Sequence, residues 1–388
     1  MKDKIFYNKH NITSADIKEV IKTLKYQKIS KGKQTFYFAK NLRKFFKSKY
    51  CLLVSSGTAA QIILAKALNW KKRDHVLLSP LSFASGANSI LLSGATPVFV
   101  DINLEDYNLD YFKLEKKLKE LKNKKKRVKA IISTDYAGIP ANWKKLKKIS
   151  KKYNLTLIND NCHALGSKYI GKHDYALKYA DYIIQSFHAV KNVTTGEGGA
   201  LLTNNLKIYK KAQSLSEHGF LKPDKILSPW DYEIRELPGY NFRISDINCS
   251  LGNSQLRRIH AIIRSRRKIA KEYNKLFANY DCFKVINENR QFQSSYHLYP
   301  LTINFAKLRV NEKKFYQKMK NSYGIHLQKH YTPTYRFKIF KKKFNLNVKN
   351  FKNTEYFYKN TFSLPLYLDL KKKKILYIFK SILNSLNL

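Results

Sequence analysis

The stretch Ser186–Ala200 has the sequence SFHAVKNVTTGEGGA and directly follows Tyr182–Gln185, a short apolar run that predicts a buried strand. Lys191 lies between this strand and a glycine-rich reversal of the chain. Burial at such a position would lower the pKa of the lysine amine and make it nucleophilic, and the glycines would let the backbone pass close to a ligand. A β-hairpin turn that carries an exposed lysine explains the same residues. The stretch by itself leaves both interpretations open.

From about residue 50 the chain alternates between short apolar runs and longer amphipathic ones. The predicted strands are Cys51–Val54, His75–Leu78, Pro97–Asp101, Val128–Ser133, Leu155–Asn159, Tyr182–Gln185 and Ala200–Thr203. The predicted helices between the earlier strands are Thr58–Leu68, Ala84–Leu92, Tyr111–Lys122 and Trp143–Tyr153. This alternation predicts an α/β domain with a mostly parallel sheet flanked by helices, and a ligand site beyond the carboxyl ends of the strands.

The pattern changes after Ile244. A long helical stretch, 245–277, precedes a predicted strand at 297–301 and a predicted helix at 312–323. We therefore expect a large domain of residues 1–244 and a smaller C-terminal α+β domain of residues 245–388. The length of 388 residues agrees with two domains, since single hydrophobic cores stop growing near roughly 250–300 residues.

The formal net charge is +48, from 75 Lys and Arg against 27 Asp and Glu. A basic excess can indicate a nucleic-acid partner. Here the lysines follow the polar faces of predicted helices such as Leu114–Leu121 and Trp143–Ile149, which is typical of solvated surface. Nucleic-acid binding is therefore a remote alternative.

The cysteines and the N-terminus indicate a reducing compartment. The four cysteines lie far apart and match neither a zinc site nor a disulfide scaffold, so no metal is expected. No apolar signal core follows Met1, and no run of about 18 apolar residues occurs. We expect a cytoplasmic protein without a membrane segment.

Two further segments place polar or small residues where predicted strands end. In Val54–Ala60, VSSGTAA, a strand leads into a helix whose first amides and dipole suit a phosphate group. Asp160 follows the apolar run Leu155–Asn159, and a carboxylate there can pair with a cationic ring nitrogen. Helix capping explains each segment equally well when it is taken alone. Their expected meeting with Lys191 at one edge of the sheet favours a common ligand.

Together these motifs resemble the sugar aminotransferase family that makes amino sugars on nucleotide carriers, a branch of the fold type I pyridoxal phosphate enzymes. The resemblance runs from Lys31-Gly32-Lys33 to Ser363–Leu366, and Ser186–Gly199 carries it most specifically. It implies a fold type I transferase, pyridoxal 5′-phosphate as the cofactor, and a homodimer with composite active sites.

The resemblance also implies roles for individual residues. Lys191 matches the lysine that forms a Schiff base with the cofactor, and Asp160 matches the carboxylate that keeps the pyridine nitrogen protonated. His163 matches a contact to the phenolic oxygen of the cofactor, and Phe83 matches a ring that stacks on the pyridine. The family's phosphate site matches Gly57, Thr58, Ala59 and Ser186 of one chain and Asn241 of the neighbouring subunit.

Segments near the expected sugar pocket indicate the substrate. Asp135–Gly138, His218-Gly219 and His330–Tyr335 most resemble the branch that uses L-glutamate to aminate C4 of a UDP-linked 4-keto-6-deoxy-2-acetamido sugar for pseudaminic acid, a bacterial surface sugar. Enzymes of the GDP-perosamine, UDP-bacillosamine or dTDP-amino-sugar type are alternatives. The candidate substrate contacts are His188, Arg243, His330 and Tyr331.

One dipeptide departs from the family pattern. Asn161-Cys162 stands where the family usually has small residues such as Ala or Ser, and the bulkier Asn161 is expected to alter the packing behind the cofactor ring. A sister branch of dehydratases has His in place of the lysine, so Lys191 argues against that branch.

Overall fold

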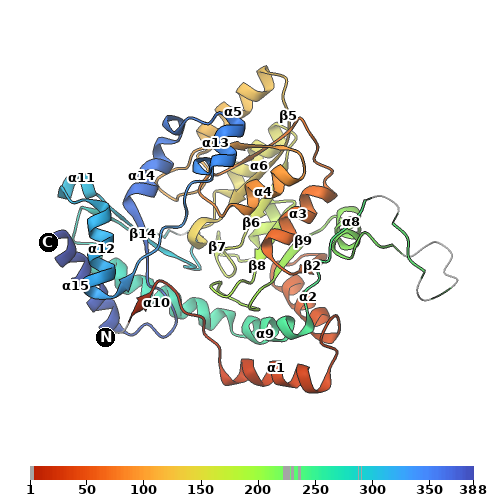
Figure 1. The fold of residues 1–388 in the computed structure, drawn as a ribbon, viewed down its shortest axis with the longest axis horizontal. Coiled ribbons are helices and arrows are strands. Elements are labelled where there is room, and N and C mark those ends of the chain that lie inside the picture. Colours follow the sequence, from red (N-terminus) through yellow and green to blue (C-terminus); the bar gives the residue numbers. More distant parts are fainter. Residues whose placement is uncertain (1–3, 222–227, 229–230, 235–236, 287, 290) are drawn as a thin grey trace.

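A seven-stranded sheet lies at the centre of the computed structural model, which describes residues 4–388 except 222–227, 229–230, 235–236, 287 and 290 (Figure 1). β9 is antiparallel to both of its neighbours, and the other strand pairs are parallel. The strand order is β2 (Tyr50–Val54), β9 (Gly199–Thr203), β8 (Tyr182–Ser186), β6 (Thr156–Asp160), β5 (Arg127–Thr134), β3 (Asp74–Leu78) and β4 (Thr96–Phe99). The predicted strands and the mixed, mostly parallel sheet are confirmed, with small shifts at the strand ends.

Helices cover both faces of this sheet, because successive side chains of a strand point to opposite faces and both sets are apolar. Leu53 and Leu77 pack in one core, whereas Val54 and Val76 pack in the other. The second core lies under α3 (Gly57–Ala67), α4 (Ser85–Leu92) and α8 (Leu206–Ser216). The first lies under α2 (Lys33–Phe46), α5 (Tyr111–Asn123), α6 (Trp143–Lys152), α7 (Tyr175–Tyr179) and α9 (Asp246–Arg257).

The helical stretch expected over 245–277 consists of two helices, α9 and α10 (Ile259–Phe277). They separate at Arg258, whose φ of −107° and ψ of 14° lie outside the helical region. α9 packs against α2 and against α1 (Ser14–Tyr26), which precedes the first strand predicted from the sequence. The predicted helical character of 245–277 is therefore confirmed, and the stretch is divided into two helices at Arg258.

The C-terminal part has a three-stranded antiparallel sheet and its own core. The sheet contains β10 (Phe283–Lys284), β12 (Tyr299–Ile303) and β14 (Thr361–Leu364). The surrounding helices are α11 (Phe305–Leu308), α12 (Glu312–Tyr323), α13 (Lys338–Phe344), α14 (Lys352–Asn360) and α15 (Lys372–Leu386). The short remaining elements are β7 (Lys168–Tyr169), β11 (Phe292–Gln293) and the 3₁₀ turns at Tyr136–Gly138, Thr334–Arg336 and Val348–Phe351.

The two ends of the chain meet in this C-terminal part (Figure 1). β1 (Ile5–Phe6) pairs in parallel with β13 (Ile325–His326), so an N-terminal strand packs into the C-terminal core. Conversely, α9 contributes to a core of the large sheet. The division at residue 244 thus remains a prediction. In the described part of the chain, every helix is too short or too polar to cross a membrane.

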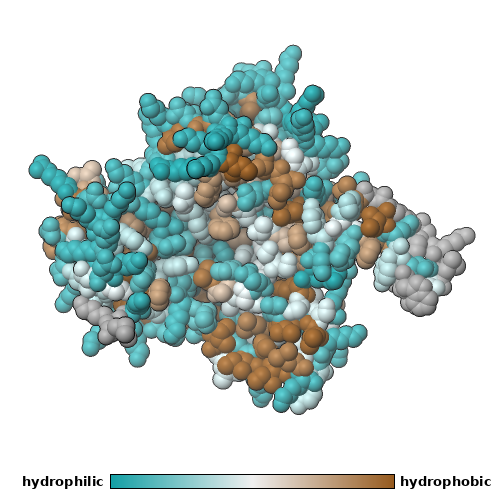
Figure 2. Space-filling model, in the orientation of Figure 1, coloured by the Kyte–Doolittle hydropathy of each residue, from teal (hydrophilic) through white to brown (hydrophobic). Residues whose placement is uncertain are grey.

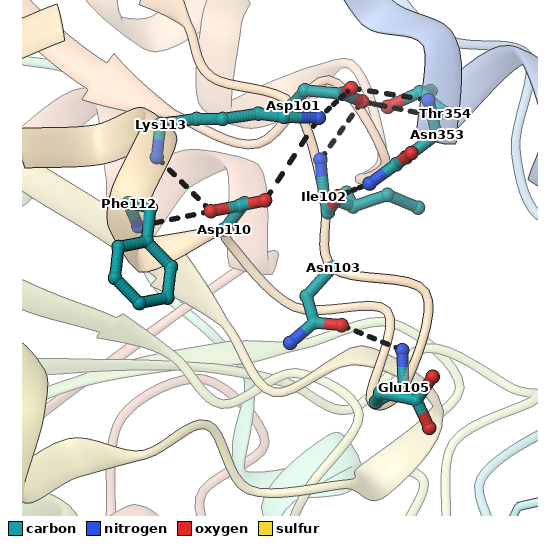
Figure 3. A network of polar contacts seen from close by, with 9 residues as sticks. All are labelled: Asp101, Ile102, Asn103, Glu105, Asp110, Phe112, Lys113, Asn353 and Thr354. Atoms are coloured by element: carbon teal, nitrogen blue, oxygen red, sulfur yellow. Dashed lines mark hydrogen bonds and ion pairs between the residues drawn. The ribbon is translucent and has the colours of Figure 1, made fainter. Parts of the chain in front are cut away.

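Asp101, just beyond β4, joins the large sheet to α14 (Figure 3). Its Oδ1 accepts hydrogen bonds from the Thr354 amide at 2.9 Å and the Thr354 hydroxyl at 2.7 Å. Its Oδ2 accepts from the Asn353 amide at 3.1 Å and from Lys113 Nζ at 2.7 Å. α14 receives no side-chain hydrogen bond from its own N-cap residue. The Asp101 carboxylate, which is distant in the sequence, therefore caps this helix.

Replacing Asp101 by alanine should lower the free energy of unfolding by about 3 kcal/mol, because the substitution removes a helix cap and a buried acceptor of five hydrogen bonds, one of them from the adjacent Ile102 amide. Urea unfolding followed by circular dichroism measures the loss. The matched control is Asp110→Ala, which removes the local cap of α5 and a 3.9 Å ion pair with the partly exposed Lys113, and should cost about 1 kcal/mol. Equal losses for the two variants would contradict the role of Asp101 as a link between the two parts.

Candidate active site

The three segments singled out in the sequence meet at one cavity of about 550 Å³. β2 and β8 are both antiparallel to β9, so they share a direction, and β6 is parallel to β8. The carboxyl ends of all three strands therefore lie at the same edge of the sheet. Of the residues predicted from the sequence, the cavity is lined by Gly57, Thr58, Phe83, Asp160, His163, Ser186, His188, Lys191, His330 and Tyr331.

The first turn of α3 forms one wall of the cavity. Ser56 caps the helix by accepting a hydrogen bond from the Ala59 amide at 3.0 Å. The amides of Gly57 and Thr58 precede the first intrahelical bonds and carry the positive end of the helix dipole. A Cβ atom at Gly199 would lie 2.3 Å from the carbonyl of Ser56, so only glycine allows β9 to approach this turn. The turn fits a phosphate group.

Lys191 lies in the connection between β8 and β9, which pair up to Ser186 and Gly199. The stretch is therefore a hairpin connection, as one interpretation of the sequence held, but its lysine faces the cavity. Desolvation lowers the pKa of Lys191, and this effect is partly opposed by Cys162 and Asp160. A lowered pKa increases the fraction of free, nucleophilic amine near neutral pH.

Asp160, the last residue of β6, is a buried carboxylate with few partners. It accepts hydrogen bonds from Gln61 Nε2 at 3.3 Å and from the Cys162 amide at 3.2 Å. Neither partner is a cation, although a buried anion gains most from one. The two neutral donors do not balance the charge of the Asp160 carboxylate. The carboxylate can therefore accept a further hydrogen bond from a cation such as the protonated nitrogen of a pyridine ring.

Two histidines of the cavity are held in the neutral state. His163 accepts a hydrogen bond at Nδ1 from the Ala137 amide (3.3 Å), so its proton is on Nε2, which lies 2.9 Å from the Tyr331 hydroxyl. Burial and the nearby Lys191 hold the pKa of His163 well below its usual value. The same causes lower the pKa of His330 to about 3, and its Nδ1 lies 2.8 Å from the Ser363 hydroxyl.

Asn161, the departure from the family pattern, is fully buried behind the strand that carries Asp160. Its Nδ2 donates to Asp135 Oδ2 and to the Tyr175 hydroxyl, both at 3.1 Å, and its Oδ1 accepts from Gln185. Burial raises the pKa of Asp135 to about 7, and the donors around its carboxyl counteract part of that effect. The larger side chain is thus accommodated by a polar network behind the site.

Three predicted residues do not line the cavity of their own chain. Ala59 is buried, and its amide donates to Ser56. Asn241 and Arg243 are exposed, and Arg243 lines a separate depression together with Lys31. For Asn241 this position agrees with a contact to a second subunit, as the resemblance implies. For Arg243 it leaves no contact with a substrate in the same chain's cavity.

Sequence reasoning missed several residues that line the cavity, among them Tyr7, Cys162, Glu197, His297 and Gln328. The N-terminal segment reaches the site because β1 pairs with β13, and the Asn8 side chain donates to the Val190 carbonyl at 2.7 Å. No sequence motif near Tyr7 indicates that this residue lies at the site. His297 was placed in an apolar strand pattern, and Cys162 was noted only as a deviation beside Asp160.

Comparison with known proteins agrees with this geometry. The family model of the DegT/DnrJ/EryC1/StrS aminotransferases matches residues 10–383. A UDP-4-amino-4,6-dideoxy-N-acetyl-beta-L-altrosamine transaminase of Campylobacter jejuni is 36% identical over 95% of this chain and 94% of its own. The structure of Helicobacter pylori PseC, an aminotransferase involved in pseudaminic acid biosynthesis, has a TM-score of 0.89, with 31% identity over 99% of this chain and 100% of its own.

A third similar protein bears on the cofactor. A Streptococcus pneumoniae protein assigned as a sugar aminotransferase, solved in its pyridoxal phosphate (PLP) form, has a TM-score of 0.89, with 28% identity over 99% of both chains. Three features of the present cavity fit that cofactor: the first turn of α3, which fits a phosphate group, the desolvated Lys191 amine, and the Asp160 carboxylate. The chain therefore belongs to the DegT/DnrJ/EryC1/StrS aminotransferase family and is a PLP-dependent sugar aminotransferase.

Proposed function

We propose that this enzyme moves the amino group of L-glutamate onto C4 of a UDP-linked 2-acetamido-2,6-dideoxy-4-keto sugar. The observation that carries the proposal is the position of Lys191 and Asp160 in one cavity beside a phosphate-binding helix turn. The Campylobacter jejuni and Helicobacter pylori relatives, at 36% and 32% identity, are both named as altrosamine transaminases, and this supports the choice of sugar.

PLP, when bound, supplies an electron sink for the carbanion that transamination requires. Lys191 would hold the cofactor covalently through its amine, and the same amine, when free, would move a proton as the general base. Asp160 holds the proton on the pyridine nitrogen. Gly57, Thr58 and Ser186 hold the phosphate group.

Two aromatic side chains position the cofactor ring in this proposal. His163 lines the cavity with its Nε2 atom 2.9 Å from the Tyr331 hydroxyl, and the resemblance expects the phenolic oxygen of the cofactor beside this imidazole. Phe83 lines the cavity with 63% of its surface exposed, which leaves its ring free to stack on the pyridine. His188, His330 and Tyr331 line the remaining wall and are the proposed contacts to the substrate.

A homodimer with composite sites is part of the proposal. Ile17, Ile21 and Leu24 follow a helical spacing and leave an apolar stripe on the exposed face of α1, which we call the α1 stripe. Figure 2 shows apolar side chains gathered over this helix. Large exposed apolar patches mark protein–protein interfaces, and a second copy of this chain is the occupant that would also bring Asn241 to a neighbouring cavity.

Replacing Ile21 by aspartate is expected to weaken the dimer at least about tenfold, because a charge would be buried in the α1 stripe. Sedimentation across a range of protein concentrations measures the dissociation constant. Lys22→Asp, on an exposed neighbouring position of the same helix, is the control and should leave the dimer intact. An unchanged dissociation constant for Ile21→Asp would show that the α1 stripe is not part of the dimer interface.

Complementation tests whether the sites are composite. Lys191→Ala and Asn241→Ala are each expected to be inactive or nearly so when purified alone. When the two are mixed and allowed to exchange subunits, activity should return, because a mixed dimer contains one site with both native residues. Mixing without any recovery would show that Asn241 does not act across a subunit boundary.

The substrate is tested by offering L-glutamate with a panel of nucleotide keto-sugars and measuring 2-oxoglutarate and the product mass. We expect the UDP-linked 2-acetamido-4-keto sugar to have the highest kcat/KM. A preference for GDP- or dTDP-linked keto-sugars would move the enzyme to another branch of the family.

We also propose a cytoplasmic location, which the four free cysteines support.

A further inference from the structure

His297 is a buried imidazole in the cavity wall for which the mechanism above has no use. It lies just before β12, lines the cavity and is only 3% exposed. Its Nδ1 atom is buried and has no hydrogen-bond partner among the described residues. An unpaired buried polar nitrogen costs about 1–3 kcal/mol, so such groups normally have a partner. The cavity is the place from which a bound partner can come.

The other buried histidines of this wall differ from His297 in this respect. His163 uses both ring nitrogens within the protein, and His330 uses Nδ1 with a serine hydroxyl. The ring of His297 lies against that of His163, with centroids 4.5 Å apart. Burial, Lys191 and His163 hold the pKa of His297 well below its usual value, so the imidazole is neutral. Its unpaired Nδ1 can therefore act as an N–H donor or as an acceptor, according to the tautomer.

The backbone around His297 is fixed firmly enough to position its ring. The buried Arg266 donates to the carbonyls of Tyr296 at 2.7 Å, His297 at 2.8 Å and Leu366 at 3.2 Å. The Ser295 hydroxyl donates to the His163 carbonyl at 3.0 Å, which ties this segment to the loop after β6. Such rigid support is expected of a residue that recognises a ligand by a directed hydrogen bond.

We propose that His297 determines substrate specificity by hydrogen-bonding a neutral polar substituent of the sugar, a hydroxyl or an acetamido group. The inference rests on the proposed function and deepens it. A neutral imidazole whose Nδ1 donates or accepts according to the tautomer complements groups that can themselves donate or accept. The carboxylates of L-glutamate only accept, and they are better matched by cations or by several donors.

The test separates the two half-reactions in single-turnover experiments on the PLP-loaded enzyme. His297→Phe keeps a ring of similar shape and removes both nitrogens. It should lower kcat/KM for the keto-sugar half-reaction about 10- to 100-fold and leave the L-glutamate half-reaction within about threefold. His297→Gln retains a donor and an acceptor, and should lose less, again only with the sugar.

Equal losses in both half-reactions would overturn the proposal, as would a loss confined to L-glutamate or no loss at all. Thermal melting and the absorbance of the lysine-bound cofactor confirm that each variant is folded and loaded. If His297→Phe does not fold, His297→Gln provides the same comparison. The sugar used is the one that the wild-type enzyme prefers in the panel, so a different sugar preference does not decide the role of His297.

Discussion

Replacing Lys191 by alanine is expected to reduce transamination by about 10⁴-fold and to abolish the absorbance of the lysine-bound cofactor. The physical reason is that, in the proposed function, the same amine holds the cofactor covalently and moves the proton. Lys191 lines this cavity, and burial lowers the pKa of its amine against the opposing effect of Cys162 and Asp160. Absorbance spectra and a 2-oxoglutarate assay measure the two effects.

The control for this variant is Lys207→Ala, which removes an exposed lysine from the first turn of α8. It should have the activity and the spectrum of the wild-type enzyme. Added small primary amines should partly restore proton transfer in Lys191→Ala, because they can replace the missing base in the cavity. A fully active Lys191→Ala enzyme would refute the assignment of this lysine and, with it, the proposed chemistry.

Replacing Asp160 by asparagine is expected to lower kcat at least about a hundredfold while leaving the fold intact. A neutral amide of the same shape cannot balance a positive charge on the pyridine nitrogen, so the ring would lose its proton and accept electrons less readily. The side chain is buried, and its hydrogen-bond donors in the described part of the chain, Gln61 and the Cys162 amide, are neutral, so its neutralisation should not lower the thermal stability of the cofactor-free protein.

Stopped-flow measurement of the L-glutamate half-reaction gives the rate, and thermal melting gives the stability. Asp160→Glu keeps the charge but shifts the carboxylate, and should fall between the wild type and Asp160→Asn. The control Asp281→Asn changes an exposed carboxylate, with 80% of its side chain accessible, and should have no effect. If Asp160→Asn retains wild-type rates, the carboxylate has no electronic role.

The local pattern of the sequence was sufficient to predict the central sheet. Most of its strands are buried on both faces, so they appear as short apolar runs, and helices separate all of them except β8 and β9. The carboxyl ends of such strands share an edge, and the meeting of Gly57, Asp160 and Lys191 followed from the order of elements and the residue types.

Other features were determined by contacts that no local pattern encodes. The N-terminal segment reaches the cavity through the pairing of β1 with β13, and Asp101 caps a helix that begins some 250 residues later in the chain. The break between α9 and α10 occurs at Arg258, whose side chain bonds to Asp16 and Asn11 near the N-terminus. A single charged residue in an amphipathic pattern does not indicate such a break.

The sequence by itself thus determined the fold class, because fold class depends on periodicity. It also singled out Lys191 and Asp160 as the proposed cofactor residues, because each of the motifs that carry the resemblance lies within a continuous segment. Only the tertiary structure decided that Lys191 faces the cavity and is desolvated, that Asn161 belongs to a polar network, and that His297 is a buried imidazole without a partner for Nδ1. Burial, pairing and pKa shifts are properties of side chains brought together from distant segments, and they exist only once the chain has folded.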